Sequence, residues 1–162
     1  MPFETPITIR DAIHRIQRRE YLLPGIQREF VWQPDQICRL FDSLVRGYPI
    51  GSFLFWRVNE EQKAGYQFYD FIRDYHEQGG RHNPKASLLP AGGLTAVLDG
   101  QQRLTSLYLG LLGSHTERRK YARRNSAGSY AKRRLYLNLA RPAVSDEVLY
   151  EFRFLEAENS FI

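Results

Sequence analysis

A strand, a tight turn and a helix follow one another around residue 100, and this succession constrains the fold more than any other part of the chain. Residues 94–98 form a short, mainly apolar run that is typical of a buried strand. Further on, apolar residues recur at the spacing of one helix face, at Leu104, Leu107, Tyr108, Leu111 and Leu112. Between the two lies the DGQQR motif, which consists of Asp99, Gly100, Gln101, Gln102 and Arg103. The sequence therefore places this motif where a strand turns into a helix N-terminus.

The DGQQR motif has the residue types of an anion-binding turn. Gly100 permits a tight turn and a close approach of the backbone to a ligand. The first N–H groups of a helix have no acceptor within the helix, so they can bind an anion, most often phosphate. Arg103 would lie in the first helical turn, where a cation opposes the helix dipole unless an anion is near. Two alternatives stay open: a bound anion, or an Asp99 cap with Arg103 paired to Asp99 or to another surface carboxylate.

A second helix is predicted upstream. Pro34 suits its first position, Asp35 suits its positive end, and Gly47 is the residue type that ends a helix. The apolar stripe of this helix consists of Ile37, Leu40, Phe41, Leu44 and Val45. A turn then leads into a predicted strand at residues 52–56.

Gln27 and Arg28 stand just before this helix, at the end of a short extended segment over residues 21–26. Taken alone, they are typical of surface residues, because arginine is mostly exposed in proteins. Taken together with the DGQQR motif, they indicate the second wall of one shared site.

Four blocks of the chain closely resemble one family. They are residues 27–32 (QREFVW), 40–44 (LFDSL), 47–51 (GYPIG) and 99–105 (DGQQRLT), in this order. The blocks resemble the N-terminal domain of GmrSD-type, modification-dependent restriction enzymes and of SspE-like anti-phage proteins. More distantly, the pattern is similar to ParB and sulfiredoxin. The resemblance extends over residues 22–112.

The resemblance implies an α+β fold, a small mixed sheet with packed helices as in the ParB and sulfiredoxin superfamily. It also implies a pocket for a nucleoside triphosphate, with Mg²⁺. The residues expected to bind the nucleotide are Gln27, Arg28, Gly100 and Arg103. The residues expected to take part in catalysis are Asp99, Gln101, Gln102 and Arg103, and Asp99 is also the expected metal ligand.

The implied function is an NTP-binding and NTP-hydrolysing module that drives or gates a nuclease restricting modified foreign DNA. Two alternatives stay open at this point. One is a nucleotide-gated DNA-binding switch without catalysis, and the other is a non-catalytic interaction scaffold. Cradling a phosphate and cleaving it require nearly the same residues, so the sequence does not separate these functions.

The expected organisation is one domain over residues 1–162, the N-terminal fragment of a protein that continues into a helical region and an HNH nuclease. Oligomers are compatible with this organisation. Residues 59–93 are predicted to be an insertion with one helical turn around residues 69–76. Residues 134–139 and 150–154 alternate polar with apolar side chains and are predicted to pair as an antiparallel hairpin. Thr8 is expected to cap a first helix whose inward residues are Ile9, Ala12, Ile13 and Ile16.

Composition excludes several classes of protein. Cys38 is the one cysteine in the sequence, which excludes an intramolecular disulfide and a cysteine zinc cluster. Because Gln101 and Gln102 stand where sulfiredoxin has its catalytic cysteine, sulfinic-acid reduction is excluded as well. Cys38 is expected to be a buried structural thiol, and His82 to lie in a loop. No apolar run approaches the length of about 20 residues that a membrane span needs, and the expected location is the cytoplasm.

The positive charge is concentrated in one segment. The net charge is +5, and residues 118–134 hold eight Lys or Arg and no acid. Residues 113–134 are therefore predicted to be a basic loop that contacts DNA phosphates. The residues expected to bind the nucleic acid are Arg118, Arg119, Lys120, Arg123 and Arg124. The alternative is a solvated loop that only aids solubility.

Overall fold

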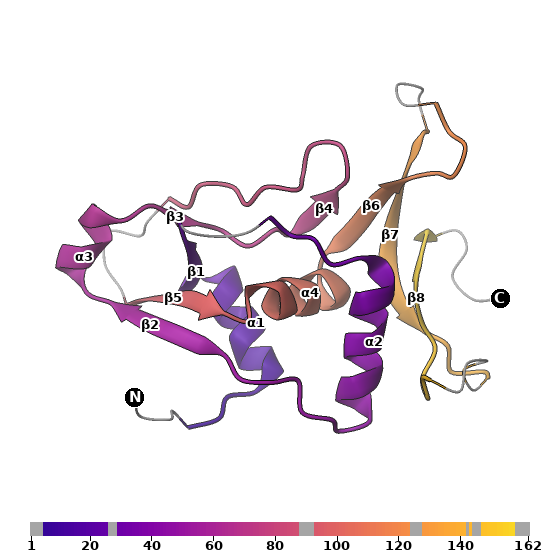
Figure 1. Cartoon of the computed structure of the whole chain (residues 1–162), viewed down its shortest axis with the longest axis horizontal. Coiled ribbons are helices and arrows are strands. Elements are labelled where there is room, and N and C mark those ends of the chain that lie inside the picture. The colour runs from indigo at the N-terminus through magenta and orange to yellow at the C-terminus, as the bar shows by residue number, and fades with distance from the viewer. Residues whose placement is uncertain are drawn as a thin grey trace. The chain divides into compact units, whose positions relative to one another are not determined.

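The structure, a computed structural model, has an α+β fold, as the sequence predicts (Figure 1). It describes residues 5–25, 29–87, 93–123, 128–141, 143 and 147–157. The helices in this part are α1 (Ile9–Gln17), α2 (Pro34–Val45), α3 (Glu60–Gly65) and α4 (Gln101–Leu111). The strands are β1 (Tyr21–Pro24), β2 (Leu54–Val58), β3 (Phe68–Tyr69), β4 (Asp74–His76), β5 (Leu94–Asp99), β6 (Ser114–Arg118), β7 (Tyr130–Leu137) and β8 (Phe152–Leu155).

The chain divides into two compact units, and each has its own four-stranded mixed sheet. Unit 1 consists of Met1–Arg28, Phe53–Phe71 and Asn83–Gln101, and unit 2 of Glu29–Ser52, Ile72–His82 and Gln102–Ile162. The sequence predicts one small mixed sheet, whereas the structure has two. Segments that are distant in sequence make up each sheet, so local patterns do not reveal this division.

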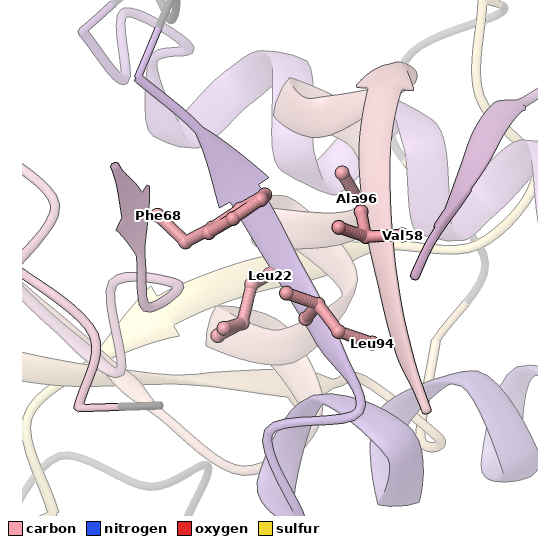
Figure 2. Packing of buried hydrophobic residues seen from close by; sticks show 5 residues of the cluster. All are labelled: Leu22, Val58, Phe68, Leu94 and Ala96. Carbon is pink, nitrogen blue, oxygen red and sulfur yellow. The ribbon is translucent and has the colours of Figure 1, made fainter. Parts of the chain in front are cut away.

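The sheet of unit 1 has the strand order β2-β5-β1-β3. Its two central strands, β1 and β5, pair in parallel, and both outer strands are antiparallel to their neighbours. Figure 2 shows five buried residues of its own strands that pack together, which are Leu22, Val58, Phe68, Leu94 and Ala96. Helix α1 contacts β1 and buries Ala12, Ile13 and Ile16. Thr8 caps this helix as predicted, but Ile9, expected to face inward, is 36% exposed in the first turn.

The sheet of unit 2 has the strand order β4-β6-β7-β8. Strands β4 and β6 are parallel, and the other two pairs are antiparallel. The predicted pairing of the last two strands is confirmed, and β7 begins earlier than expected, at Tyr130. Helix α2 contacts β8 beside it (Figure 1), with the rings of Phe41 and Phe152 5.6 Å apart.

Two sequence predictions are wrong in this part of the chain. The helical turn expected around residues 69–76 is absent from the described structure, because β3 pairs with β1 there and β4 pairs with β6. The segment expected to be a basic loop, residues 113–134, contains strand at both ends, since β6 covers residues 114–118 and β7 covers residues 130–134. In both places, pairing between strands overrides a local pattern of glycine, proline or charge.

Asp42 is a buried carboxylate that joins α2 to the segment before β8. It is 3% exposed and accepts hydrogen bonds from the backbone N–H groups of Leu149 (3.0 Å) and Tyr150 (2.8 Å). Arg46, one helical turn further on, pairs with it at 3.2 Å. Burial acts to raise the pKa of Asp42, but these hydrogen bonds outweigh it and hold that pKa below its ordinary value. Asp42 therefore stays ionised and fixes the entry into β8.

His115 is a buried neutral histidine in the sheet of unit 2. It is 2% exposed, and its ring lies 4.3 Å from Tyr75 and 5.4 Å from Phe154. Within the described residues, its Nε2 has no hydrogen-bond partner. Burial, followed by the positive charge of Arg133, lowers the pKa of His115 to about 4. The imidazole is therefore neutral in the folded protein down to mildly acidic pH.

We expect the free energy of unfolding to fall by about 2 kcal/mol between pH 7 and pH 5 through His115 alone. An unfolded histidine takes up a proton below its ordinary pKa, whereas the folded one does not, so acid favours the unfolded chain. Urea unfolding at the two pH values measures this loss. His115→Gln should remove most of it, and His14→Gln, at an exposed site, should leave it unchanged. A His115→Gln protein with the full loss would contradict the assignment.

Candidate functional site

The predicted strand, turn and helix around the DGQQR motif are confirmed. Strand β5 ends at Asp99, whose side chain is exposed, and α4 begins at Gln101. Gly100 lies between them with a φ of +88°. The apolar face of α4 is buried at Leu104, Leu107 and Tyr108, while Leu111 and Leu112 are half exposed at the end of the helix.

Two features of unit 1 require glycine at position 100. Its positive φ lies in the left-handed region, which side chains disfavour. In addition, a Cβ atom built there would lie 2.2 Å from Cδ1 of the Phe53 ring. Gly100 therefore has a structural reason to be glycine that does not depend on a ligand.

The side-chain amides of the motif hold backbone segments in place. Gln101 donates from Nε2 to the carbonyl of Val97 in β5, at 2.9 Å. Gln102 accepts a hydrogen bond at Oε1 from the N–H of Val31 (3.1 Å) and donates from Nε2 to the carbonyl of Glu29 (2.9 Å). The amide of Gln102 thus pairs with the backbone on both sides of residue 30, in the segment that follows Arg28 in the chain.

The Arg103 side chain is hydrogen-bonded to the segment that leads from α2 to β2. Its Nη1 donates to the carbonyl of Ile50 (2.6 Å) and its Nη2 to the carbonyl of Ser52 (2.7 Å). Between them, Gly51 has a φ of +87°, and a Cβ atom there would lie 2.5 Å from Nη1. The sequence leaves two partners open for Arg103, an anion or a carboxylate. The structure adds a third kind of partner, the two backbone carbonyls.

Within unit 2, Gln102 and Arg103 thus tie the first turn of α4 to the two segments that flank α2. Gln102 holds residues 29–31 before that helix, and Arg103 holds residues 50–52 after it. Sequence reasoning did not identify Gly51 as part of this arrangement. The signal was present, because Gly51 closes the GYPIG block of the resemblance.

Several predicted residues lie outside the described part of the chain. Gln27 and Arg28 are among them, so their expected position beside the DGQQR motif stays a prediction. Arg124 lies outside it as well. Of the other predicted DNA contacts, Arg118 ends β6, and the exposed residues Arg119, Lys120 and Arg123 follow in the connection to β7.

The remaining predictions concern thiol and metal chemistry. Cys38 is half-buried, and burial, followed by the charge of Asp35, raises the pKa of its thiol to about 11, so the thiol stays protonated. His82 lies in a loop as predicted, with Nδ1 3.4 Å from the Glu29 carboxylate. Among the described residues, no three His, Cys, Asp or Glu side chains are grouped as metal ligands. No helix in that part is both long and apolar enough to span a membrane.

Comparison with known proteins places the chain in a family. The profile of the family described as "GmrSD restriction endonuclease, N-terminal domain" matches residues 9–159. "Uncharacterized protein MJ0686" of Methanocaldococcus jannaschii is 39% identical to the chain over 98 residues. This match covers 60% of the chain and 16% of that relative, so the chain spans only a small part of the relative's length. Since the profile covers nearly all of the sequence, the chain belongs to the family of GmrSD restriction endonuclease N-terminal domains.

Proposed function

We propose that this domain binds a nucleoside triphosphate with Mg²⁺ at the DGQQR motif. We further propose that hydrolysis of this nucleotide drives or gates a nuclease that restricts modified foreign DNA. The observation that carries the proposal is the turn at Gly100, after which the first N–H groups of α4 follow directly. These groups have no acceptor inside the helix and suit a phosphate. Membership in a restriction endonuclease family supports the link to a nuclease.

Three residues of the motif, Asp99, Gly100 and Arg103, have a role in this proposal. Gly100 and the first turn of α4 hold a phosphate, and Arg103 neutralises it. A guanidinium has five N–H donors, so contacts with two carbonyls do not exhaust it. Asp99, which is exposed, positions Mg²⁺ or the attacking water. The resemblance to the ParB and sulfiredoxin superfamily adds Gln27 and Arg28 to the residues that we propose to bind the nucleotide.

A second candidate is a nucleotide-gated DNA-binding switch without catalysis. The contacts of Gln101 and Gln102 favour it, because both amides are hydrogen-bonded to backbone groups of the protein itself. An amide held in this way is less suited to orient an attacking water. A scaffold that binds no nucleotide is the remaining alternative.

The test compares Asp99→Asn with Asp35→Asn, since both aspartates are exposed and lie near the start of a helix. Calorimetry with each of the four common ribonucleoside triphosphates and Mg²⁺ measures binding, and phosphate release measures hydrolysis. We expect Asp99→Asn to lower hydrolysis by about 100-fold or more while the protein still binds nucleotide. Asp35→Asn should behave as the wild type. Binding without hydrolysis in the wild type would favour the switch, and the absence of binding would overturn the nucleotide proposal.

A further inference from the structure

The register of the sheet in unit 2 gathers basic residues from three separate positions of the sequence on one face. Arg118 of β6 is paired with Tyr130 of β7, and Tyr136 of β7 is paired with Arg153 of β8. Paired residues share a face, and so do alternate residues along a strand. The basic face, as we call it, therefore carries four exposed cations: Arg118, Lys132, Arg134 and Arg153.

The opposite face of this sheet is packed against the unit's own residues. Tyr75, His115 and Ala131 are buried there. Arg133, which alternates with the cations of the basic face, lies on this packed side and pairs with the Glu117 carboxylate at 3.6 Å. Two basic residues of β7, Lys132 and Arg134, therefore lie on the basic face, whereas Arg133 lies on the packed face. The sequence alone does not show which face is packed.

The positive charge of the basic face is only partly neutralised. Asp74 of β4 lies 3.3 Å from the Lys132 ammonium and also accepts a hydrogen bond from a serine hydroxyl. Arg153 pairs with Glu151. Among the residues that the structure describes, no carboxylate lies within salt-bridge distance of Arg118 or Arg134. The pKa of Asp74 is nevertheless lowered by the serine hydrogen bond, by Lys132 and also by the charge of Arg134. The face therefore presents more positive than negative charge.

We propose that the basic face binds the phosphate backbone of duplex DNA. Three of its four cations are arginines, whose planar, forked donors match phosphate oxygens. Each phosphate that a cation neutralises releases counterions from the duplex, which favours binding without regard to base sequence. This inference rests on the proposed function in one respect, namely that the polyanion bound by the basic face is DNA. It does not require a nucleotide at the DGQQR motif.

This surface differs from the one that the sequence predicts. Of the five residues expected to bind the nucleic acid, only Arg118 belongs to the basic face. Lys132 and Arg134 lie within the predicted basic segment, residues 113–134, and Arg153 lies outside it. Arg119 pairs with Glu156, and the Lys120 ammonium lies 5.5 Å from the centre of the Tyr121 ring. The face and the connection between β6 and β7 can therefore be tested with separate variants.

The test measures binding of a fluorescent duplex as a function of salt for three double variants that each remove two positive charges. They are Arg134→Gln/Arg153→Gln on the basic face, Arg119→Gln/Lys120→Gln in the connection, and the control Arg10→Gln/Arg39→Gln. The face variant should lower the slope of log K against log salt by about 1.8, or about 60-fold in affinity at 0.1 M salt. The other two should keep the wild-type slope.

Two outcomes would overturn the proposal: a face variant with the wild-type slope, or a wild-type protein whose binding to the duplex does not depend on salt. A slope that falls only in the connection variant would assign the contact to that segment instead. Circular dichroism checks folding, and the single variant Arg134→Gln, expected to lose about 0.9 of slope, serves if the double variant does not fold. Nucleotide affinity, measured by calorimetry on the same face variant, should be unchanged, which separates this test from that of the nucleotide site.

Discussion

Gly100→Ala should lower the free energy of unfolding by about 3 to 4 kcal/mol. A left-handed backbone costs a non-glycine residue roughly 1–2 kcal/mol, and overpacking typically costs about 1–3 kcal/mol more. Both terms apply here, because φ is +88° and the new Cβ would meet the Phe53 ring at 2.2 Å. Urea unfolding followed by circular dichroism measures the change.

Gly47→Ala is the matched control for the backbone term. Gly47 has a φ of +77°, and nothing lies within 4 Å of a Cβ atom built there. We therefore expect Gly47→Ala to cost only about 1 kcal/mol. In a Phe53→Ala background, Gly100→Ala should also cost little more than this backbone term, because the ring is gone. Equal costs for the two glycines in the wild-type background would show that the contact with Phe53 does not matter.

The helices that flank the site were predictable because the signals that define them are local. Pro34 and Gly47 stand at the two ends of α2, and the apolar spacing between them is that of a helix. The same holds for β5 and the start of α4, where an apolar run, one glycine and a leucine pattern follow in order. Such features are written within a dozen residues and do not depend on the rest of the fold.

The contacts of Gln102 and Arg103 were not predictable, because their partners are distant in sequence. Gln102 pairs with the backbone at residues 29 and 31, and Arg103 with that at residues 50 and 52. Every residue type except proline has the same backbone carbonyl and N–H groups, so the sequence does not indicate which of these groups a side chain will contact. The division of the basic residues between the two faces of β7 is similar, since it depends on register with β6 and β8.

Arg103→Ala should lower the free energy of unfolding by about 3 kcal/mol and weaken nucleotide binding by roughly 10- to 150-fold. From the sequence alone, the substitution is expected to affect affinity with little loss of stability. The structure changes that expectation, because the guanidinium makes two short hydrogen bonds to the carbonyls of Ile50 and Ser52. Chemical unfolding and calorimetry measure the two effects separately.

Arg103→Lys distinguishes the two roles of this side chain. A lysine keeps the positive charge, but its single ammonium cannot bridge the carbonyls on both sides of Gly51 as the planar fork does. If Arg103 acts mainly by neutralising phosphate, Arg103→Lys should keep most of the nucleotide affinity while losing stability. If it acts by holding residues 50–52 in place, Arg103→Lys should lose affinity almost as fully as Arg103→Ala. Arg39→Ala, at an exposed site on α2, should change neither quantity. Wild-type stability in both Arg103 variants would contradict the role of the carbonyl contacts, and wild-type affinity in both would remove Arg103 from the nucleotide site.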